Sequence, residues 1–347
     1  METSSTESGQ KNKFQNASVV DTRHNNTNSD KKIFAVVNPT AGGGRTGELW
    51  PQVQTQLQNK GFALAAQYTD YPGHAQKITR NQLENGCKTI MAVGGDGTFG
   101  EVAGGFYNGN ELVSPEAYMR PFPLGSGCDL TLNFNLKPGP GAAKNFKLEG
   151  QKHQLDVLEM SSDHSSEKSK EHILGQRSQR NVAVNVADIG AIARSLDILH
   201  KRGYKKSTFN YVRSALFTAL SYSAFSTRVE VDGSLLFAGK ALDIFILNGP
   251  TLGGGFTLAP TADPADSQLD VIVLPAMGKL KFIQVFFRAL QGNHLNHPKI
   301  KYSQGSRVKI SLQEPDIPLE LDGDFMTKLP SGEVNFQLKT ASLPLEV

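Results

Sequence analysis

The chain has 347 residues, of which 38% are hydrophobic and 20% charged, enough apolar material for globular cores and too much for disorder throughout. The formal net charge of +3 is too balanced for a protein that binds nucleic acid by neutralising phosphates. Two cysteines without a CxxC spacing argue against a disulfide scaffold and a thiolate zinc site. No apolar run is long enough to span a membrane and no secretory signal is visible, so we expect a cytoplasmic protein.

The first half of the chain alternates strand and helix patterns. Residues 1–30 are polar and predict a disordered tail. Residues 31–145 then carry short apolar runs at 33–37, 62–68, 88–93 and 122–124, separated by helical spacing of apolar residues. This alternation predicts an α/β nucleotide-binding domain with a parallel sheet between two layers of helices.

The second half, residues 146–347, changes character. Its strands alternate and its turns are denser, which predicts a β-rich sandwich domain with flanking helices. Residues 161–179 are rich in Ser, Lys, Glu and His and predict a flexible insertion. The expected strands are 181–186, 227–231, 241–247, 269–274, 306–312, 317–321 and 334–338, and the expected helices are 192–202, 208–221 and 279–290.

The string Gly94-Gly95-Asp96-Gly97-Thr98 follows the third strand and opens a helix. Glycines allow the backbone to approach a phosphate and direct N–H groups at its oxygens, and a helix N-terminus favours the same anion. A carboxylate in such a turn would repel a triphosphate unless a divalent cation lay between them. Asp96 therefore indicates Mg²⁺ together with a nucleotide.

Two further glycine turns follow the first and fourth strands. One is Asn38-Pro39-Thr40-Ala41-Gly42-Gly43-Gly44-Arg45, and the other is Gly125-Ser126-Gly127. Each alone could be a tight turn with no ligand. Parallel strands end at one edge of a sheet, however, so together the three turns predict one anion-binding pocket.

These turns resemble the catalytic domain of diacylglycerol kinases, and in particular the bacterial soluble lipid kinases of a superfamily that includes sphingosine and ceramide kinases. Asn248, Gly253-Gly254-Gly255, Ala259-Pro260 and the stretch from Asp266 to Asp270 resemble the second-domain signature of that family. Asp322-Gly323-Asp324 resembles its closing Asp-Gly-Glu. The resemblance begins near Lys32 and continues to the C-terminus.

The resemblance implies roles for individual residues. Asp324 would be the proton acceptor, and Asp322 and Asp96 would lie in the same cleft as catalytic residues. A structural Mg²⁺ would be held by Asp263, Asp266 and the backbone of Gln268. The residues implied to bind ATP are Asn38, Pro39, Thr40, Ala41, Gly42, Thr69, Gly95, Asp96, Gly97, Thr98, Phe99, Gly100, Glu101 and Ser126.

The chain departs from the family pattern at four positions. Gly100 and Cys128 each replace a usual Asn, Ser267 replaces a Gly, and Asp324 replaces a usual Glu. The last change shortens the side chain by about 1.5 Å, one bond length, and a misplacement near 1 Å can cost about a hundredfold in rate.

The sequence therefore predicts an ATP-dependent lipid kinase that transfers the γ-phosphate to a hydroxyl of a diacylglycerol-like, sphingoid or ceramide lipid. Its expected partners are ATP with Mg²⁺ and a lipid at a membrane surface contacted peripherally, with no nucleic acid; a homodimer stays open. Two alternatives also stay open: a kinase of a soluble substrate, and a weak or inactive nucleotide-binding regulatory relative, to which the four departures point.

Overall fold

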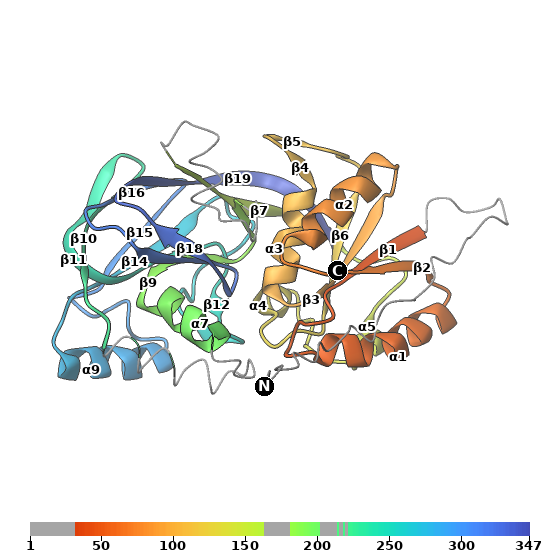
Figure 1. Ribbon diagram of the computed structural model, residues 1–347, viewed down its shortest axis with the longest axis horizontal. Helices are drawn as coiled ribbons and strands as arrows, with labels where there is room; N and C mark the ends of the chain where they lie inside the picture. The colour runs from red at the N-terminus through yellow and green to blue at the C-terminus, as the bar shows by residue number, and fades with distance from the viewer. Residues whose placement is uncertain (1–31, 163–180, 202–213, 215–217, 219–220) are drawn as a thin grey trace, which may run out of the picture.

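The computed structural model describes residues 32–162, 181–201, 214, 218 and 221–347 (Figure 1). The predicted tail over residues 1–30 lies outside these described residues, as do most of the insertion predicted at 161–179 and most of the helix predicted at 208–221.

The first half is a three-layer α/β unit, as predicted. Four parallel strands lie in the order β6-β3-β1-β2, and their apolar runs are almost fully buried because helices cover both faces. One face packs against α1 through Trp50, Val53 and Leu57, and the other against α2 and α3 through Ile78 and Phe99. The bounds are β1 (Lys32–Val37), α1 (Arg45–Asn59), β2 (Ala63–Tyr68), α2 (His74–Glu84), β3 (Thr89–Gly94), α3 (Asp96–Gly105), β4 (Tyr107–Asn108), β5 (Glu111–Leu112), β6 (Tyr118–Pro123), α4 (Asp129–Leu132) and α5 (Ala142–Asn145).

The second half is β-rich and mainly antiparallel, also as predicted. Apart from the separate β12–β13 pair, its strands share one network that branches at β11, which pairs with β9, β10 and β14. The bounds are β7 (Lys152–Ser162), β8 (Val182–Ala183), β9 (Val186–Gly190), α7 (Ala191–Lys201), β10 (Phe225–Val231), β11 (Ser234–Leu247), β12 (Thr251–Leu252), β13 (Phe256–Thr257), β14 (Leu269–Pro275), α9 (Lys279–Leu290), β15 (Lys301–Gly305), β16 (Arg307–Leu312), β17 (Ile317–Leu321), β18 (Asp324–Leu329) and β19 (Gly332–Glu346).

The strand predicted at 181–186 is wrong in its bounds. It is split into β8 and β9, because the backbone N–H groups of residues 184–186 donate to the side chain of Asp322. The backbone of these three residues is thus directed at a carboxylate rather than continuing one strand.

The strand β19 joins the two halves and is much longer than the predicted 334–338. It pairs with β16 and β7, and near its end Leu345 pairs in parallel with Met119 of β6. Figure 1 shows it running from the second half into the first. Leu343 and Leu345 accordingly belong to the same hydrophobic cluster as Phe99. The last strand of the chain therefore completes the core of the first half.

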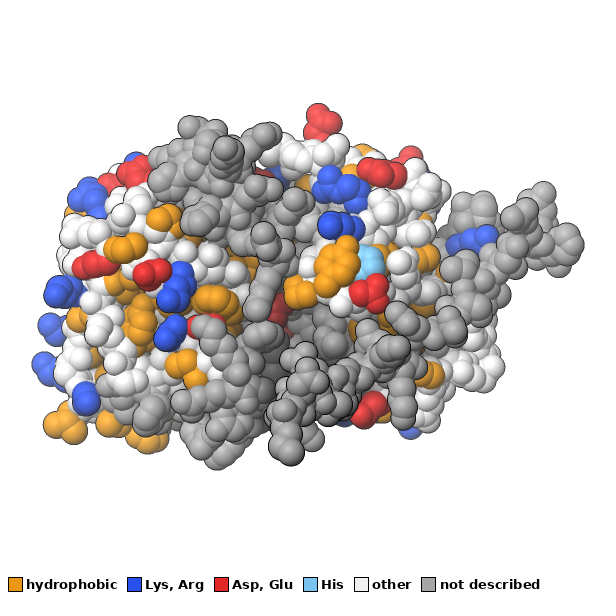
Figure 2. All heavy atoms as spheres, viewed as in Figure 1, with side chains coloured by type: hydrophobic (Ala, Val, Ile, Leu, Met, Phe, Trp, Pro, Cys, Tyr) orange, Lys and Arg blue, Asp and Glu red, His pale blue; other side chains and the backbone are white. Residues whose placement is uncertain are grey.

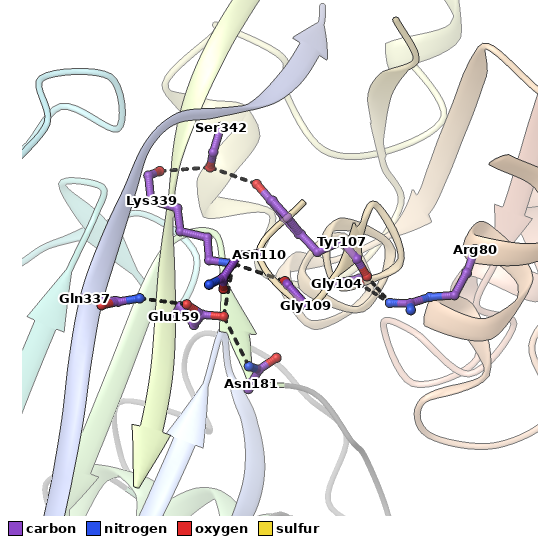
Figure 3. A network of polar contacts seen from close by, with 10 residues as sticks. All are labelled: Arg80, Gly104, Tyr107, Gly109, Asn110, Glu159, Asn181, Gln337, Lys339 and Ser342. Carbon is purple, nitrogen blue, oxygen red and sulfur yellow. Dashed lines mark hydrogen bonds and ion pairs between the residues drawn. The ribbon is translucent and has the colours of Figure 1, made fainter. Parts of the chain in front are cut away.

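A polar network fixes the β4–β5 hairpin to the second half (Figure 3). The Lys339 ammonium lies 3.0 Å from the Glu159 carboxylate and donates to the carbonyl of Gly109 at 3.3 Å. Tyr107 and Ser342 share a hydrogen bond of 2.8 Å between their hydroxyl groups. Both charged side chains are largely buried, so the network holds the halves together on a side away from the glycine turns.

None of the helices in the described ranges combines the length and the hydropathy that a membrane crossing requires.

Candidate active site

The three glycine turns come together at the carboxyl edge of the parallel strands. The N–H of Gly125 donates to the carbonyl of Gly94 at 2.7 Å. A Cβ on Gly125 would lie 2.5 Å from the Cα of Gly95, so the close approach of the two turns requires a glycine at position 125. On the other side, a Cβ on Gly42 would lie 3.4 Å from the carbonyl oxygen of Leu124. The sequence correctly predicts that these turns form one edge.

The first turn is linked to the 94–98 turn by side chains. Asn38 donates through Nδ2 to the hydroxyl of Thr98 at 3.0 Å, while its Oδ1 accepts from the N–H and hydroxyl of Thr40. Gly44 precedes α1 with a φ of 95°, and no side chain caps this helix end. In the first turn of α1 the N–H groups of Thr46 and Gly47 donate to the carbonyl oxygens of Ala41 and Pro39, so the start of this helix favours an anion through its dipole.

Asp96 is buried, and its side chain does not project outward from the turn. Its two oxygens accept the N–H groups of Asp129 and Leu130, each at 2.9 Å, at the start of α4. Burial, followed by the negative charge of Asp129, raises the pKa of Asp96 to about 7, although the two backbone hydrogen bonds act in the other direction. Asp96 thus ties the 94–98 turn to the segment that follows the 125–127 turn.

Asp129 is a residue that the sequence analysis missed. Its carboxylate accepts the N–H groups of Gly254 and Gly255 at 2.8 and 2.7 Å, so the first half binds a loop of the second half directly. Burial raises the pKa of Asp129, and these two hydrogen bonds oppose that shift. The triple glycine at 253–255 was a visible signal, but nothing in the sequence paired it with Asp129.

Asp322 and Asp324 lie at the β17–β18 turn, where Asp322 has a φ of 48°. Asp322 is buried and accepts three backbone N–H groups, from Val184, Asn185 and Val186, at 2.8 to 3.0 Å. Asp324 is half-buried and opens β18. A Cβ on Gly97 would collide with the Asp324 carboxylate, so this side chain lies directly against the 94–98 turn of the other half.

The other residues implied to bind ATP fall into two groups. Thr40 and Ser126 are exposed, and Gly95 and Gly97 are partly exposed, so they can meet a ligand. Phe99 and Gly100 are buried, and Phe99 belongs to the hydrophobic core. Pro39, Ala41, Gly42 and Thr69 are partly exposed beside the same edge.

Glu101 faces away from the turns. Its carboxylate accepts the N–H groups of Gly73 and Ala75 at the start of α2, at 2.8 and 3.2 Å. The side chain therefore caps a neighbouring helix, and this position contributes to α2–α3 packing.

The predicted structural metal site is a loop with its own hydrogen bonds. Asp263 accepts the N–H of Ala265 at 3.0 Å, and Asp266 accepts the N–H of Gln268 at 2.9 Å. Burial is the main cause of the raised pKa of Asp266, with a further contribution from the charges of Asp263 and Asp156. Carboxylate and carbonyl oxygens suit Mg²⁺. In the described part of the chain, however, no three Asp, Glu, His or Cys side chains gather as a metal-binding group.

Asp156, which the sequence analysis also missed, connects this loop to the rest of the fold. Its carboxylate accepts the N–H of Ser267 at 2.7 Å and the N–H of Ala341 in β19 at 2.5 Å. Ser267, which replaces the family's glycine, has a φ of 65°. The Asp156 carboxylate therefore holds the loop in place by accepting a backbone N–H group of the loop.

A cluster of buried carboxyl groups lies behind Asp322 and Asp324. Asp188 of β9 is paired with Glu320 of β17, and Asp243 lies on the neighbouring β11. All three are at most 1% exposed, and each has at least one oxygen without a hydrogen-bond partner. Burial raises the pKa of Asp243 to about 7, and burial together with neighbouring carboxylates raises the pKa values of Asp188 and Glu320 well above the ordinary range.

Next to this cluster is a cavity of about 100 Å³, partly open to solvent. Apart from Asp243 and His294 its walls are apolar, and they come from α7, β11 to β14 and α9. Leu252 and Phe256 in its wall flank the loop that Asp129 binds. The cavity therefore adjoins the contact between the two halves.

Comparison with known proteins agrees with this arrangement. Residues 32–160 match the diacylglycerol kinase catalytic domain, and residues 185–342 match the YegS C-terminal NAD kinase beta sandwich-like domain. The chain is 24% identical over 316 residues to a diacylglycerol kinase of Staphylococcus carnosus (strain TM300), covering 88% of this chain and 93% of that one. It is 24% identical over 307 residues to a diacylglycerol kinase of Bacillus subtilis (strain 168), covering 88% and 93%.

A solved structure of a diacylglycerol kinase from Bacillus anthracis str. Sterne has the same fold. It matches with a TM-score of 0.66 at 18% identity and covers 92% of this chain and 98% of that one. The two domain matches follow one another along nearly all of the described chain. The first half of the chain thus matches the catalytic domain of diacylglycerol kinases and the second half the YegS C-terminal domain, and this similarity supports a kinase activity.

Proposed function

We propose that the protein transfers the γ-phosphate of ATP to the hydroxyl group of a lipid, and that Asp324 is the general base. The observation that carries this proposal is the position of the Asp324 carboxylate against Gly97, because it brings an acid of the second half to the glycine turn of the first. A base must come within about 3 Å of the hydroxyl that it deprotonates. Because the backbone at Asp324 lies close to the turn, we propose that the Asp side chain, although shorter than Glu, can act as this base.

The reaction balances with the residues at this edge. The lipid hydroxyl gives its proton to Asp324 as its oxygen forms a bond to the γ-phosphorus, and the bond from that phosphorus to the bridging oxygen breaks to release ADP. The partly exposed backbone of Gly95 and Gly97, the dipole at the start of α1 and the hydroxyl of Ser126 are the groups expected to position the phosphates. Positioning and electrostatic stabilisation provide most of the catalysis in this class of reaction.

Three buried carboxylates have a structural role in this proposal: Asp96, Asp129 and Asp322. Each accepts backbone N–H groups of a different segment, so each fixes the cleft by orienting backbone. We therefore assign Asp96 and Asp322 as positioning residues, which refines their predicted catalytic role. Removing either would leave backbone N–H groups buried without partners.

Mg²⁺ fits this cleft by donor type, since its acidic oxygens are the ligands that a hard divalent cation prefers. No metal-binding group of three such side chains is formed within the described residues. We propose that Mg²⁺ arrives on the phosphates of ATP, beside the Asp324 carboxylate, which lies against Gly97. It would there neutralise charge that develops on the transferred phosphoryl group.

A lipid is the preferred acceptor because of the cavity beside the 253–255 loop. A kinase of a soluble substrate would need polar groups to recognise it, whereas this cavity has an almost entirely apolar wall. We propose that the alkyl chains of the substrate lie in this cavity and that its hydroxyl group lies towards Asp324. A cytoplasmic location with peripheral membrane contact belongs to the same proposal.

The test is a phosphotransfer assay with labelled ATP over diacylglycerol, sphingoid bases and ceramide in mixed micelles. We expect at least one lipid to be phosphorylated and soluble polyols to remain unlabelled. Wild-type protein that binds ATP and labels no lipid would favour the inactive regulatory relative, and labelling of a soluble alcohol alone would favour a kinase of a soluble substrate.

A further inference from the structure

The helix α9 has two apolar faces. Phe282, Val285, Phe286 and Ala289 face inward and form part of the wall of the apolar cavity. On the opposite side Leu280 is 80% exposed and Phe287 is 58% exposed. These are the two most exposed large hydrophobic side chains in the described part of the chain, and they are seven residues apart, two turns along the same face.

The stretch of sequence that contains α9 is basic. From Val271 to Gln313 the sequence has no acidic residue, and its basic residues are Lys279, Lys281, Arg288, Lys299, Lys301, Arg307 and Lys309. Lys279, Lys281 and Arg288 are on α9 itself and are exposed, and in the described ranges none of the three pairs with a carboxylate. Figure 2 shows hydrophobic side chains gathered at the end of the molecule where α9 lies, with Lys and Arg side chains beside them.

An exposed apolar stripe flanked by cations is the pattern of a helix that lies in a membrane interface. A water-exposed face gains nothing from Leu280 and Phe287, because contact between large apolar side chains and water is unfavourable. Lys and Arg beside them are attracted to anionic headgroups. The positive charge and the exposed apolar side chains of α9 thus complement the surface of an anionic lipid bilayer.

We infer that α9 is the surface through which the protein docks on an anionic lipid bilayer, with Leu280 and Phe287 inserted and Lys279, Lys281 and Arg288 at the headgroups. This inference rests on the proposed lipid substrate. The same helix separates the bilayer from the cavity, since its inner residues are part of the cavity wall. Docking would therefore place the cavity beside the membrane from which the substrate is taken.

The test measures vesicle binding and catalysis separately on the full-length protein. Sedimentation with vesicles of phosphatidylserine and phosphatidylcholine is compared with sedimentation with phosphatidylcholine alone. The first variant is Leu280→Ser/Phe287→Ser, with Leu148→Ser/Leu235→Ser as a control that removes two other exposed leucines. The second is Lys279→Gln/Lys281→Gln/Arg288→Gln, with Lys137→Gln/Lys144→Gln/Lys147→Gln as its control for net charge.

We expect wild type and both controls to bind the anionic vesicles. The apolar variant should bind about tenfold more weakly, and the charge variant about fivefold more weakly for each cation removed. Phosphorylation of lipid in detergent micelles should be unchanged in both, because micelles deliver the substrate without docking.

Equal vesicle binding by wild type and the α9 variants would overturn the inference. An equal loss of activity on micellar lipid would also overturn it, since α9 would then support the cavity itself. A change from dimer to monomer in Leu280→Ser/Phe287→Ser would assign the face to a second copy of the chain instead. Failure of the proposed function would be seen independently, as wild-type protein that binds vesicles and phosphorylates no lipid.

Discussion

The two halves of the molecule contribute different chemical groups to their shared cleft. The first half contributes glycine backbone: Gly95 and Gly125 approach so closely that a Cβ on Gly125 would lie 2.5 Å from Gly95. The second half contributes carboxyl groups on adjacent strands, with Asp188, Asp243 and Glu320 buried behind Asp322 and Asp324. One side is therefore suited to accept an anion, and the other to hold charge or protons near it.

The difference shows how each side is kept in place. Glycine turns are fixed by steric necessity, so a single methyl group can displace them. The carboxylates Asp96, Asp129 and Asp322 are fixed by the backbone N–H groups that they accept from other segments. These contacts cross between the halves or between turns, and their loss should spread beyond one residue.

Gly125→Ala should have the largest effect on activity, because it disturbs the close contact between glycine turns in the first half. The added Cβ would meet the backbone of Gly95, so the two turns must separate. We expect phosphotransfer to fall by about a hundredfold or more, since a shift near 1 Å at a reacting site costs that much. Gly141→Ala is the matched control, because Gly141 has a φ of −63° and an added Cβ there would meet nothing within 4 Å.

Activity and ATP affinity of both glycine variants can be measured side by side by the labelled-ATP assay and by calorimetry. An unchanged rate in Gly125→Ala would mean that contact between the turns is not needed for the reaction.

Asp96→Ala is the next largest change. It leaves the N–H groups of Asp129 and Leu130 buried without partners, at a cost of about 1–3 kcal/mol each. We expect strong loss of activity and a lower melting temperature while the circular dichroism spectrum keeps its native shape. Full turnover would remove Asp96 from the site, and a native melting temperature would show that its bonds to α4 do not stabilise the fold.

The buried carboxyls of the second half predict a pH dependence of stability. The pKa of Asp243 is about 7 in the folded protein and near 3.8 when exposed. The folded state therefore holds this proton more tightly, so the stabilisation is complete below about pH 4 and is lost as the pH rises through about 7. Asp188, Glu320, Arg194 and Tyr222 are the other charged or titratable groups around it.

Asp243→Asn removes one of these protons and should reduce the fall in the free energy of unfolding between about pH 5 and pH 8, at about 1.4 kcal/mol per unit of pKa difference at most. Urea unfolding at the two pH values measures it. Asp316→Asn, at an exposed position with a φ of 65° that Asn tolerates, makes the same chemical substitution outside the buried cluster and is the control. If the free energy of unfolding changed equally with pH in wild type and Asp243→Asn, Asp243 would be ionised in the folded protein.

The smallest expected effect concerns the loop with Asp263 and Asp266. If a cation is bound there, Asp266→Asn and chelation should each lower the melting temperature by a few degrees, about 1 kcal/mol for a chain of this size. A turn stabilised by its own hydrogen bonds would respond to Asp266→Asn and not to chelation. Differential scanning fluorimetry with and without EDTA separates the two results.

Much of the first half could be predicted from the sequence because its signals are local. The apolar runs indicate the strands, and the glycine strings indicate the turns that meet at one edge. The sequence could not pair Asp129 with the 253–255 loop, nor Asp156 with Ser267, because these partners are 111 or more residues apart and the carboxylates follow no repeat.

The second half is harder to predict for a related reason. The predicted strand 181–186 is wrong because backbone N–H groups within it donate to the carboxylate of Asp322, which is 136 to 138 residues away in the chain. The β19 strand is longer than its local pattern indicates because its last pairing is with β6 and its apolar residues enter the core of the first half. Cys128, which replaces a usual Asn of the family, has a φ of 67°, a conformation that Asn adopts more easily.

The central claim is that Asp324 completes the site of the first half with an acid of the second half that touches its turn. The most direct measurement is the turnover number and the ATP dissociation constant of Asp324→Asn, with Asp324→Glu as its partner. We expect Asp324→Asn to lower kcat by about a hundredfold or more with nearly unchanged ATP binding, since the lost interaction belongs to the transition state, and Asp324→Glu to remain active. Wild-type kcat in Asp324→Asn, or an inactive wild type that Asp324→Glu restores, would contradict the claim.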